Sequence, residues 1–176
     1  MSWYMNVQSR YLTISGLIQR WLEPLVLLSA RLLIAKVFLY SGLSKWQGFL
    51  QFDSNKYDLF LYEFFCPETI RPGALVLCDS ETMEYAQGAF GQQLAELLAF
   101  SAGILEVFLP ILLVIGLLSR ISALGLLTMT LFIQLAVYPD WAHFWNPAAW
   151  WLVVLMLLMV RGPGSLSIDR LLRLER

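Results

Sequence analysis

Four charged side chains lie within or beside long hydrophobic runs of this sequence. Arg31 and Lys36 lie inside the run 25–43, and Lys45 follows that run closely. Glu106 lies in the middle of a later run. A charge at the depth of a bilayer costs about 2.5–3.5 kcal/mol on insertion scales, so it normally faces the interior of a helix bundle and has a partner there. We therefore expect Glu106, Arg31 and Lys36 to carry the chemistry of this protein.

The spacing of these charges suggests how they pair. Arg31, Gly42 and Lys45 share one face of a helix, because their separations are close to whole helical turns. Lys36 is about 16 Å from the inner end of its run and Glu106 about 18 Å from the outer end of its own, which places them at nearly the same level. The long side chain of Arg31 reaches up a turn from the face that carries Gly42. We expect Arg31 to be the partner of Glu106, with Lys36 turned toward another acceptor or the lipid.

Two plainer explanations remain open for these charges. Arg31 and Lys45 stand toward the two ends of their run, so each side chain could extend to the headgroups on its own side of the bilayer. A buried ion pair, in turn, often only fixes the register of two helices.

The composition is that of a membrane protein. Hydrophobic residues make up 59% of the 176 residues and charged residues 14%, with a mean hydropathy of +0.65, far from the averages of soluble domains. A net charge of −1 and the lack of a basic tract exclude a general nucleic-acid-binding protein. The chain has one histidine, so a multi-histidine metal site within it is excluded and we expect no metal.

The hydrophobic runs predict an all-α membrane protein, a single domain over 1–176 whose four transmembrane helices form an antiparallel bundle. A stripe of apolar residues in the N-terminal stretch predicts an interfacial amphipathic helix and not a signal peptide. A basic amphipathic tail is expected at the other terminus. The expected segments are an interfacial helix at 1–21, spans at 25–45, 94–118, 121–138 and 148–160, an extracytoplasmic cap at 46–93, and a tail at 165–176.

Positive charge is unevenly divided between the two sides of this arrangement. Arginines dominate one set of helix ends, and most acidic residues fall on the other side, in the insert between the first two spans. Because cytoplasmic loops carry an excess of lysine and arginine, both termini are expected in the cytoplasm. The arginines that decide this orientation are Arg10, Arg20, Arg120, Arg161, Arg170, Arg173 and Arg176.

The two cysteines, Cys66 and Cys78, both fall in the insert. In an oxidising compartment such a pair most often forms a structural disulfide, which would add about 3 kcal/mol in the chain-entropy model. The alternative is a redox-active cysteine pair. However, the disulfide oxidases of bacterial membranes need two cysteine pairs that exchange disulfides, and this chain has one pair.

Aromatic residues crowd the short loop that precedes the last span. His143 lies between Trp141 and Trp145, at the level of the outer headgroups. These side chains suit an aromatic belt that anchors the protein at the interface. His143 also suits a hydrogen-bond donor to a quinone carbonyl, with a proton that exchanges near neutral pH.

Four short motifs together resemble those of the DoxX family of integral membrane proteins. They are Arg31-x(10)-Gly42-x-x-Lys45, Glu106-x(9)-Gly116-Leu-x-Ser119-Arg120, Gly162-Pro-Gly-x-x-Ser167-x-Asp169 and Tyr62-Glu-Phe-x-x-Pro67. The resemblance covers roughly residues 30–172 and leaves the disulfide insert, Glu96 and the N-terminal helix without a counterpart. It implies a four-helix protein of the bacterial inner membrane. Relatives include membrane subunits of a thiosulfate:quinone oxidoreductase, and others accompany copper-peptide or oxidative-stress enzymes.

Our leading hypothesis from these observations is a membrane subunit that passes electrons from an extracytoplasmic or membrane-bound partner to the quinone pool. In it Arg31 and Lys36 stabilise the reduced ring and Glu106 relays protons. The residues expected to bind the quinone are His143, Trp145, Lys45 and Gly42.

Two other functions are consistent with the sequence. One is a non-catalytic scaffold or assembly factor in copper handling or oxidative-stress defence, whose acidic insert docks a partner. The other, a small-solute carrier, is weaker because the chain lacks paired broken-helix repeats. The sequence leaves a homo-oligomer open.

Overall fold

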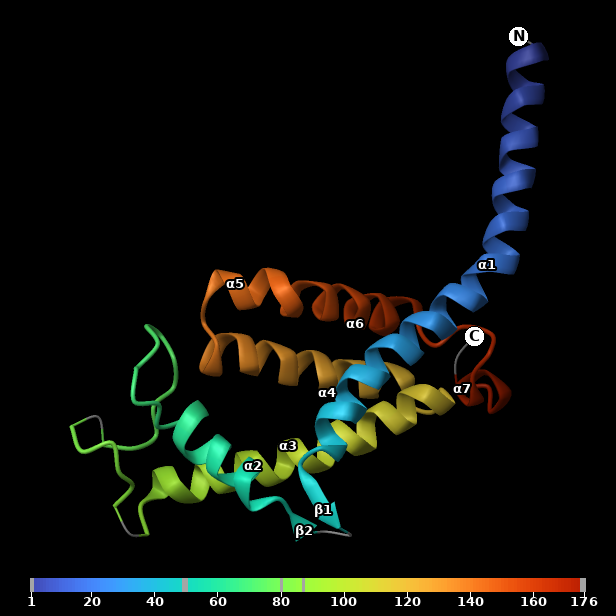
Figure 1. The fold of residues 1–176 in the computed structure, drawn as a ribbon. Coiled ribbons are helices and arrows are strands. Elements are labelled where there is room, and N and C mark those ends of the chain that lie inside the picture. Colours follow the sequence, from blue (N-terminus) through green and yellow to red (C-terminus); the bar gives the residue numbers. More distant parts are fainter. Residues whose placement is uncertain (1, 49–50, 80, 87, 175–176) are drawn as a thin grey trace.

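The protein is described here by a computed structural model that covers residues 2–48, 51–79, 81–86 and 88–174, with side chains from residue 7 onward. Its long helices run side by side as a bundle, with irregular segments gathered at one end (Figure 1). The elements are α1 (Ser2–Leu43), β1 (Trp46–Gly48), β2 (Gln51–Phe52), α2 (Ser54–Asp58), η1 (Leu59–Phe64), α3 (Phe90–Ile115), α4 (Ser119–Phe132), η2 (Ile133–Val137), α5 (Trp141–His143), η3 (Phe144–Ala148), α6 (Ala149–Arg161) and α7 (Ile168–Leu171).

The first helix, α1, joins two segments that the sequence predicted as separate. It is continuous over 42 residues and contains Pro24, and its N-terminal part bends away from the bundle (Figure 1). Proline lacks an N–H and its ring crowds the preceding turn, so a bend there does not require the helix to end. Tyr11, Ile18 and Trp21 are exposed on the projecting part. That this part lies on the membrane surface stays a prediction.

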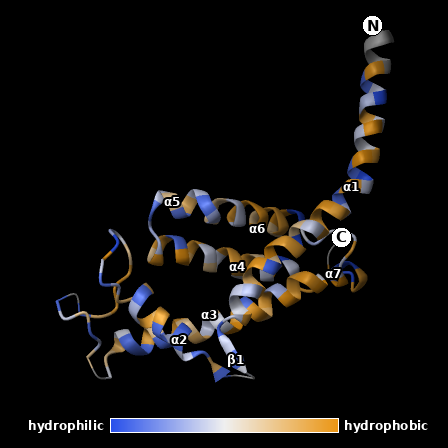
Figure 2. Ribbon diagram, in the orientation of Figure 1, coloured by the Kyte–Doolittle hydropathy of each residue, from blue (hydrophilic) through white to orange (hydrophobic). Residues whose placement is uncertain are grey.

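Three helical segments within the described residues are long and apolar enough to cross a membrane (Figure 2). They are Phe90–Ile115, Ser119–Val137 and Trp141–Arg161. The expected span at 25–45, which lies in the bundle part of α1, stays a prediction. The second expected span ends three residues early because Gly116 takes a left-handed conformation, with φ of 72°, that closes α3. The last one begins early because Asp140 caps α5, accepting a hydrogen bond of 2.8 Å from His143 N.

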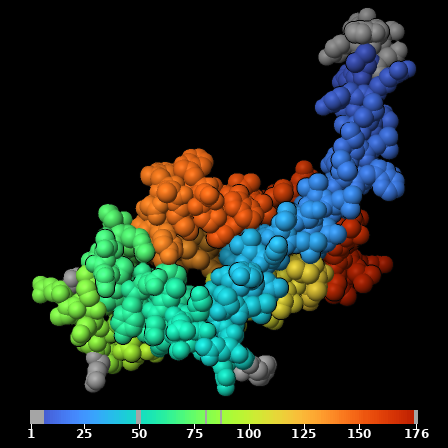
Figure 3. Space-filling model, viewed as in Figure 1, coloured from blue at the N-terminus to red at the C-terminus, as the bar shows by residue number. Residues whose placement is uncertain are grey.

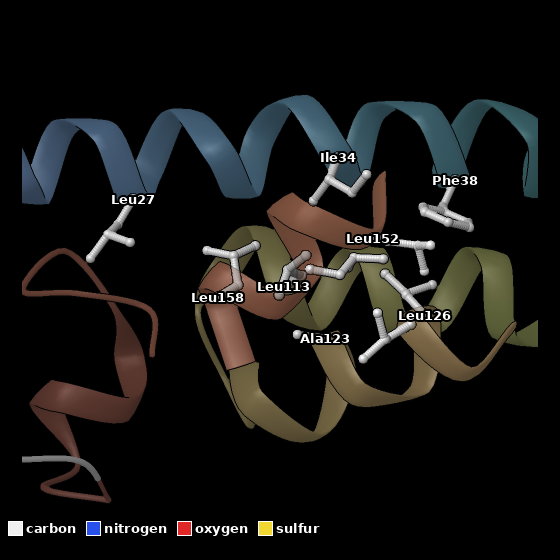
Figure 4. Close-up of a cluster of buried hydrophobic side chains, with 10 residues drawn as sticks. Leu27, Ile34, Phe38, Leu113, Ala123, Leu126, Leu152 and Leu158 are labelled. Atoms are coloured by element: carbon white, nitrogen blue, oxygen red, sulfur yellow. The ribbon is translucent and has the colours of Figure 1, made fainter. Parts of the chain in front are cut away.

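Side chains from four helices form the main hydrophobic core (Figure 4). The cluster combines Leu27, Ile34 and Phe38 of α1, Leu113 of α3, Ala123, Leu126 and Leu127 of α4, and Leu152, Leu155 and Leu158 of α6. The bundle part of α1 is therefore packed among the three apolar helices. The chain enters the insert at the end of α1 and leaves it at the start of α3. Both points lie at the same end of the bundle, so these two helices run antiparallel.

The described residues between 46 and 89, here called the cap, pack on the end of the bundle where α1 ends and α3 begins. Leu75 N donates to Ala136 O over 2.7 Å, and Arg71 donates to Val137 O over 3.3 Å while its guanidinium lies 4.6 Å from the centre of the Tyr138 ring. The cap and the 138–140 turn thus share one end of the bundle, the cap end. Inside the cap, the expected disulfide between Cys66 and Cys78 is confirmed.

The opposite end of the bundle, here called the arginine end, is where α3 and α6 finish and α4 begins. The C-terminal segment 162–174 packs there, and Asp169 N donates to Gly116 O over 2.8 Å.

The two ends give a prediction about topology that thiol labelling checks. The native cysteines are bonded to each other, so an introduced cysteine is the reactive thiol among the described residues. In intact spheroplasts an impermeant maleimide should label Glu81→Cys and Trp141→Cys alike, because both positions belong to the cap end. It should leave Arg173→Cys unlabelled until the membrane is opened, since arginine-rich ends stay in the cytoplasm. Labelling of only one of Glu81→Cys and Trp141→Cys would contradict the fold. Labelling of Arg173→Cys in intact spheroplasts, with the other two protected, would show that the protein has the opposite orientation.

Candidate functional site

A buried ion pair between Lys45 and Glu106 lies where α1 meets α3 at the cap end. Lys45 Nζ contacts Glu106 Oε2 directly, and the two residues are 7% and 4% exposed. The same ammonium donates to Ser41 Oγ over 2.9 Å and to Ser41 O over 3.3 Å. An ammonium has three N–H donors, so these contacts use all of them. The positive charge is fully satisfied without help from water or ligand.

Gly42 makes this pairing possible by letting the two helices touch at the backbone. A Cβ at residue 42 would lie 2.7 Å from the carbonyl carbon of Glu106 and 2.8 Å from its oxygen, closer than side chains tolerate. Pro110, one turn further along α3, cannot donate to that carbonyl. The carbonyl oxygen left without this helical hydrogen bond lies against Gly42 of α1.

The ion pair forms part of the wall of a cavity of about 500 Å³ lined by α1, the cap, α3, α4 and η2. The cavity is open to the surface, and Figure 3 shows a hollow between the blue α1, the green cap and the orange part of the chain. Charged groups in the lining are Lys45, Lys56 and Glu106, and the rest is apolar, aromatic or hydroxyl-bearing. The full lining is Ser41, Ser44, Lys45, Lys56, Leu59, Phe60, Phe64, Phe65, Leu98, Ser101, Ala102, Leu105, Glu106, Gly125, Thr128, Met129, Phe132, Ile133, Val137 and Tyr138.

The predicted pairing of Arg31 with Glu106 is wrong. Arg31 is fully buried at the arginine end, where its Nη2 donates to Leu166 O and its charge is within Coulomb range of Asp169. The prediction failed because the positions of Arg31 and Lys45 on one face do not fix which of them is level with Glu106. Lys45 follows the end of α1, and its side chain points back toward Ser41 and reaches the carboxylate of Glu106.

Arg31 belongs to a second buried cluster, formed with the C-terminal segment. Asp169 is 2% exposed and accepts hydrogen bonds from Leu118 N at 2.7 Å and Ser119 N at 2.9 Å. It therefore caps the first turn of α4, where a carboxylate is favoured by the helix dipole. Gly116 lets the Arg31 guanidinium lie against the end of α3, because a Cβ at residue 116 would collide with Arg31 Nη1.

The family motifs thus divide between two sites. Gly42, Lys45 and Glu106 meet at the cap end, whereas five other motif residues meet at the arginine end. The five are Arg31, Gly116, Ser119, Ser167 and Asp169.

Two of the seven expected site residues, Lys45 and Glu106, line the cavity, and five do not. The five are Arg31 and Gly42, described above, and Lys36, Trp145 and His143. Lys36 is exposed on α1, in line with the expectation that it turns away from Glu106. Trp145 is 70% exposed at the cap end. His143 stacks on Tyr138, with ring centroids 4.8 Å apart, and its Nδ1 lies 2.7 Å from Gln134 Oε1. Since Tyr138 lines the cavity, His143 supports the wall from behind.

Sequence reasoning missed several residues of the site. Ser41 binds the Lys45 ammonium, and the four-residue spacing on one helix was the signal that could have identified it. Lys56 reaches the cavity through the folding of the cap, and Tyr138 reaches it from the turn after η2. The sequence offers no comparable signal for either. The described residues contain no cluster of three or more histidine, cysteine or acidic side chains that could hold a metal ion.

Comparison with known proteins agrees with the motifs. The DoxX family model matches residues 26–139, more than half of the chain. No curated protein and no solved structure matches this chain.

Removal of one member of the ion pair should leave the other buried without compensation. We expect Lys45→Met and Glu106→Gln each to lower the free energy of unfolding, Lys45→Met by about 3–5 kcal/mol, and the double variant to lose less than the sum. Lys56→Met is the matched control, because Lys56 lines the same cavity but is only half-buried. Denaturant titration in detergent, followed by circular dichroism, measures the cycle. Strictly additive losses would show that the two side chains do not interact.

The Asp169 cluster gives a separate prediction. Asp169→Asn should lower the free energy of unfolding by about 3–5 kcal/mol, because the buried Arg31 loses its nearest negative charge and two backbone donors lose a carboxylate. Arg173→Gln, which removes an exposed charge from the same segment, is the control. Thermal unfolding in detergent distinguishes them, and equal midpoints for Asp169→Asn and the natural protein would refute a stabilising role for the Asp169 carboxylate.

Proposed function

The chain belongs to the DoxX family, a family of membrane proteins, and we propose that it is a membrane subunit of a redox system that binds a quinone and passes electrons from a partner to the quinone pool. The observation that carries this proposal is the cavity of about 500 Å³ between the helices and the cap, whose mostly apolar lining holds a buried carboxylate, two lysines and a few hydroxyl groups. Sites for small organic ligands have this character, with few polar groups in a mostly apolar lining.

The size and lining of the cavity suit the ring of a quinone. Phe60, Phe64 and Tyr138 offer aromatic faces, and aliphatic side chains such as Leu98 and Met129 complete the lining. A ring of this kind is apolar on its faces and accepts hydrogen bonds at its two carbonyl oxygens. When bound it would supply two-electron redox chemistry, with the electrons coming from a partner protein.

Glu106 is the side chain suited to handle a proton in this cavity. Its Oε2 is held by Lys45, while Oε1 has no hydrogen bond to any described residue. As a carboxylate Oε1 accepts a hydrogen bond from a quinol hydroxyl, and when protonated it donates one to a quinone carbonyl. Lys45, whose three donors are all engaged, holds the carboxylate in place.

The finer topology belongs to the same proposal. The bundle part of α1 is the fourth span, beside the three apolar helices, and the protein is set in the bacterial inner membrane with both termini in the cytoplasm. The cap is then extracytoplasmic, where a disulfide is stable and an electron-donating protein partner has access to it.

A second function is favoured by the charge of the cap surface. Its exposed acidic residues are Asp58, Glu63, Glu68, Asp79, Glu81 and Glu84. Such a surface suits a scaffold or assembly factor that docks a basic or metal-loaded partner without chemistry in the bundle.

Bound quinone measured by mass spectrometry tests the first proposal. Protein purified into nanodiscs with a short-chain ubiquinone should retain about one quinone per chain. Ala102→Phe should reduce that ratio at least about tenfold, because the new ring fills the cavity. Ala142→Phe adds the same ring at an exposed position outside the lining and should have no effect. Equal retention by both variants, or none by the natural protein, would exclude the quinone site.

Two further variants separate the two functions in cells. Glu106→Gln, at normal membrane levels, should abolish function if the chemistry takes place in the bundle. Replacement of Glu63, Glu68, Glu81 and Glu84 by glutamine should abolish it only if the cap surface docks the partner.

A further inference from the structure

A second, polar groove lies at the arginine end, far from the quinone cavity. It has a volume of about 430 Å³ and is formed where α1 bends, α6 finishes and the C-terminal segment passes. Three arginines border it, one from each of these segments, and they are Arg20, Arg161 and Arg170. The groove therefore exists only in the folded bundle.

The positive charge of the groove is only partly neutralised. Glu23 is the one acidic residue in its lining, and its two oxygens receive Arg161 Nη1 at 3.2 Å and Gln19 Nε2 at 3.3 Å. Arg20 and Arg170 have no acceptor among the described residues. With three guanidinium groups and one carboxylate, the groove carries a net charge of +2.

The Arg161–Glu23 pair is itself open to competition. The two side chains are 56% and 36% exposed, and exposed pairs of this kind contribute little to stability. An anion with several oxygens can therefore replace Glu23 as the partner of Arg161 at low cost. Guanidinium groups bind phosphate oxygens in pairs, which gives such an anion more hydrogen bonds than the carboxylate supplies.

Apolar residues belong to the groove and continue beside it along the chain. Pro24 and Leu27 of α1 line it. Leu25 of α1 and Val160 of α6, each next in sequence to a lining residue, are 54% and 68% exposed. A free anion gains no binding energy from an apolar surface, whereas a phospholipid would place its acyl chains along it. The arginine side chains would then stand at the level of the headgroups.

We propose that this groove binds the phosphate of an anionic phospholipid, held by Arg20, Arg161 and Arg170. Glu23 acts as an internal competitor that occupies Arg161 when no lipid is bound. The site is independent of the quinone cavity, since it lies at the other end of the bundle and shares no lining residue with it.

Native mass spectrometry of the full chain with added lipid tests this site. Phosphatidylglycerol should remain bound where phosphatidylcholine does not. Arg20→Gln and Arg170→Gln should each lower retention about fivefold. Glu23→Gln should raise retention, because it removes the competing carboxylate, and a merely structural defect would not produce an increase.

The controls address general charge and free phosphate. The pair Arg10→Gln/Arg173→Gln removes two exposed charges outside the groove and should leave retention unchanged. Excess inorganic phosphate should not displace the lipid. Equal loss in the control pair, no lipid selectivity, a fall in retention with Glu23→Gln, or full displacement by phosphate would each overturn the proposal.

Discussion

The structure depends on the requirement that no charge be buried without compensation. Lys45 and Glu106 meet this requirement at the cap end, where the ammonium also takes both acceptors of Ser41. Removal of an ion from water costs several kcal/mol, and only close contact with an opposite charge offsets this cost. That contact needs the backbones of α1 and α3 to touch, and Gly42 is the residue that allows it. The helix register, the glycine and the position of the cavity all follow from this pair.

The same requirement is met by other means at the arginine end. Arg31 is buried against the C-terminal segment, with a backbone carbonyl as its hydrogen-bond partner and Asp169 as its nearest negative charge. Asp169 in turn is committed to the first turn of α4. A single carboxylate thus serves a helix dipole and an arginine, so this end of the bundle is held by a network and not by one bond. Two atoms of Arg31, Nε and Nη1, have no hydrogen-bond partner among the residues that the structure describes.

Much of this could be predicted from the sequence, and the reasons are physical. Long apolar runs must be helices in a membrane, so the three apolar helices and the family could be recognised from local patterns. The disulfide followed from two cysteines in one loop. The partner of Glu106 could not be found, because depth counted along a sequence ignores the tilt of α1 and the turn after Leu43. The cavity and the groove depend on how the cap and the C-terminal segment fold back, which is a long-range property.

The order of residues in the chain also sets the order in which the bundle can mature. Arg31 leaves the ribosome well before Leu166 and Asp169, its two partners at the arginine end. The nascent chain must therefore accommodate an uncompensated guanidinium while the intervening helices enter the bilayer. Until residues 166–169 are synthesised, Arg31 lacks both of the partners that it has in the folded bundle. The arginine end therefore reaches its final packing only after the C-terminal segment has been made.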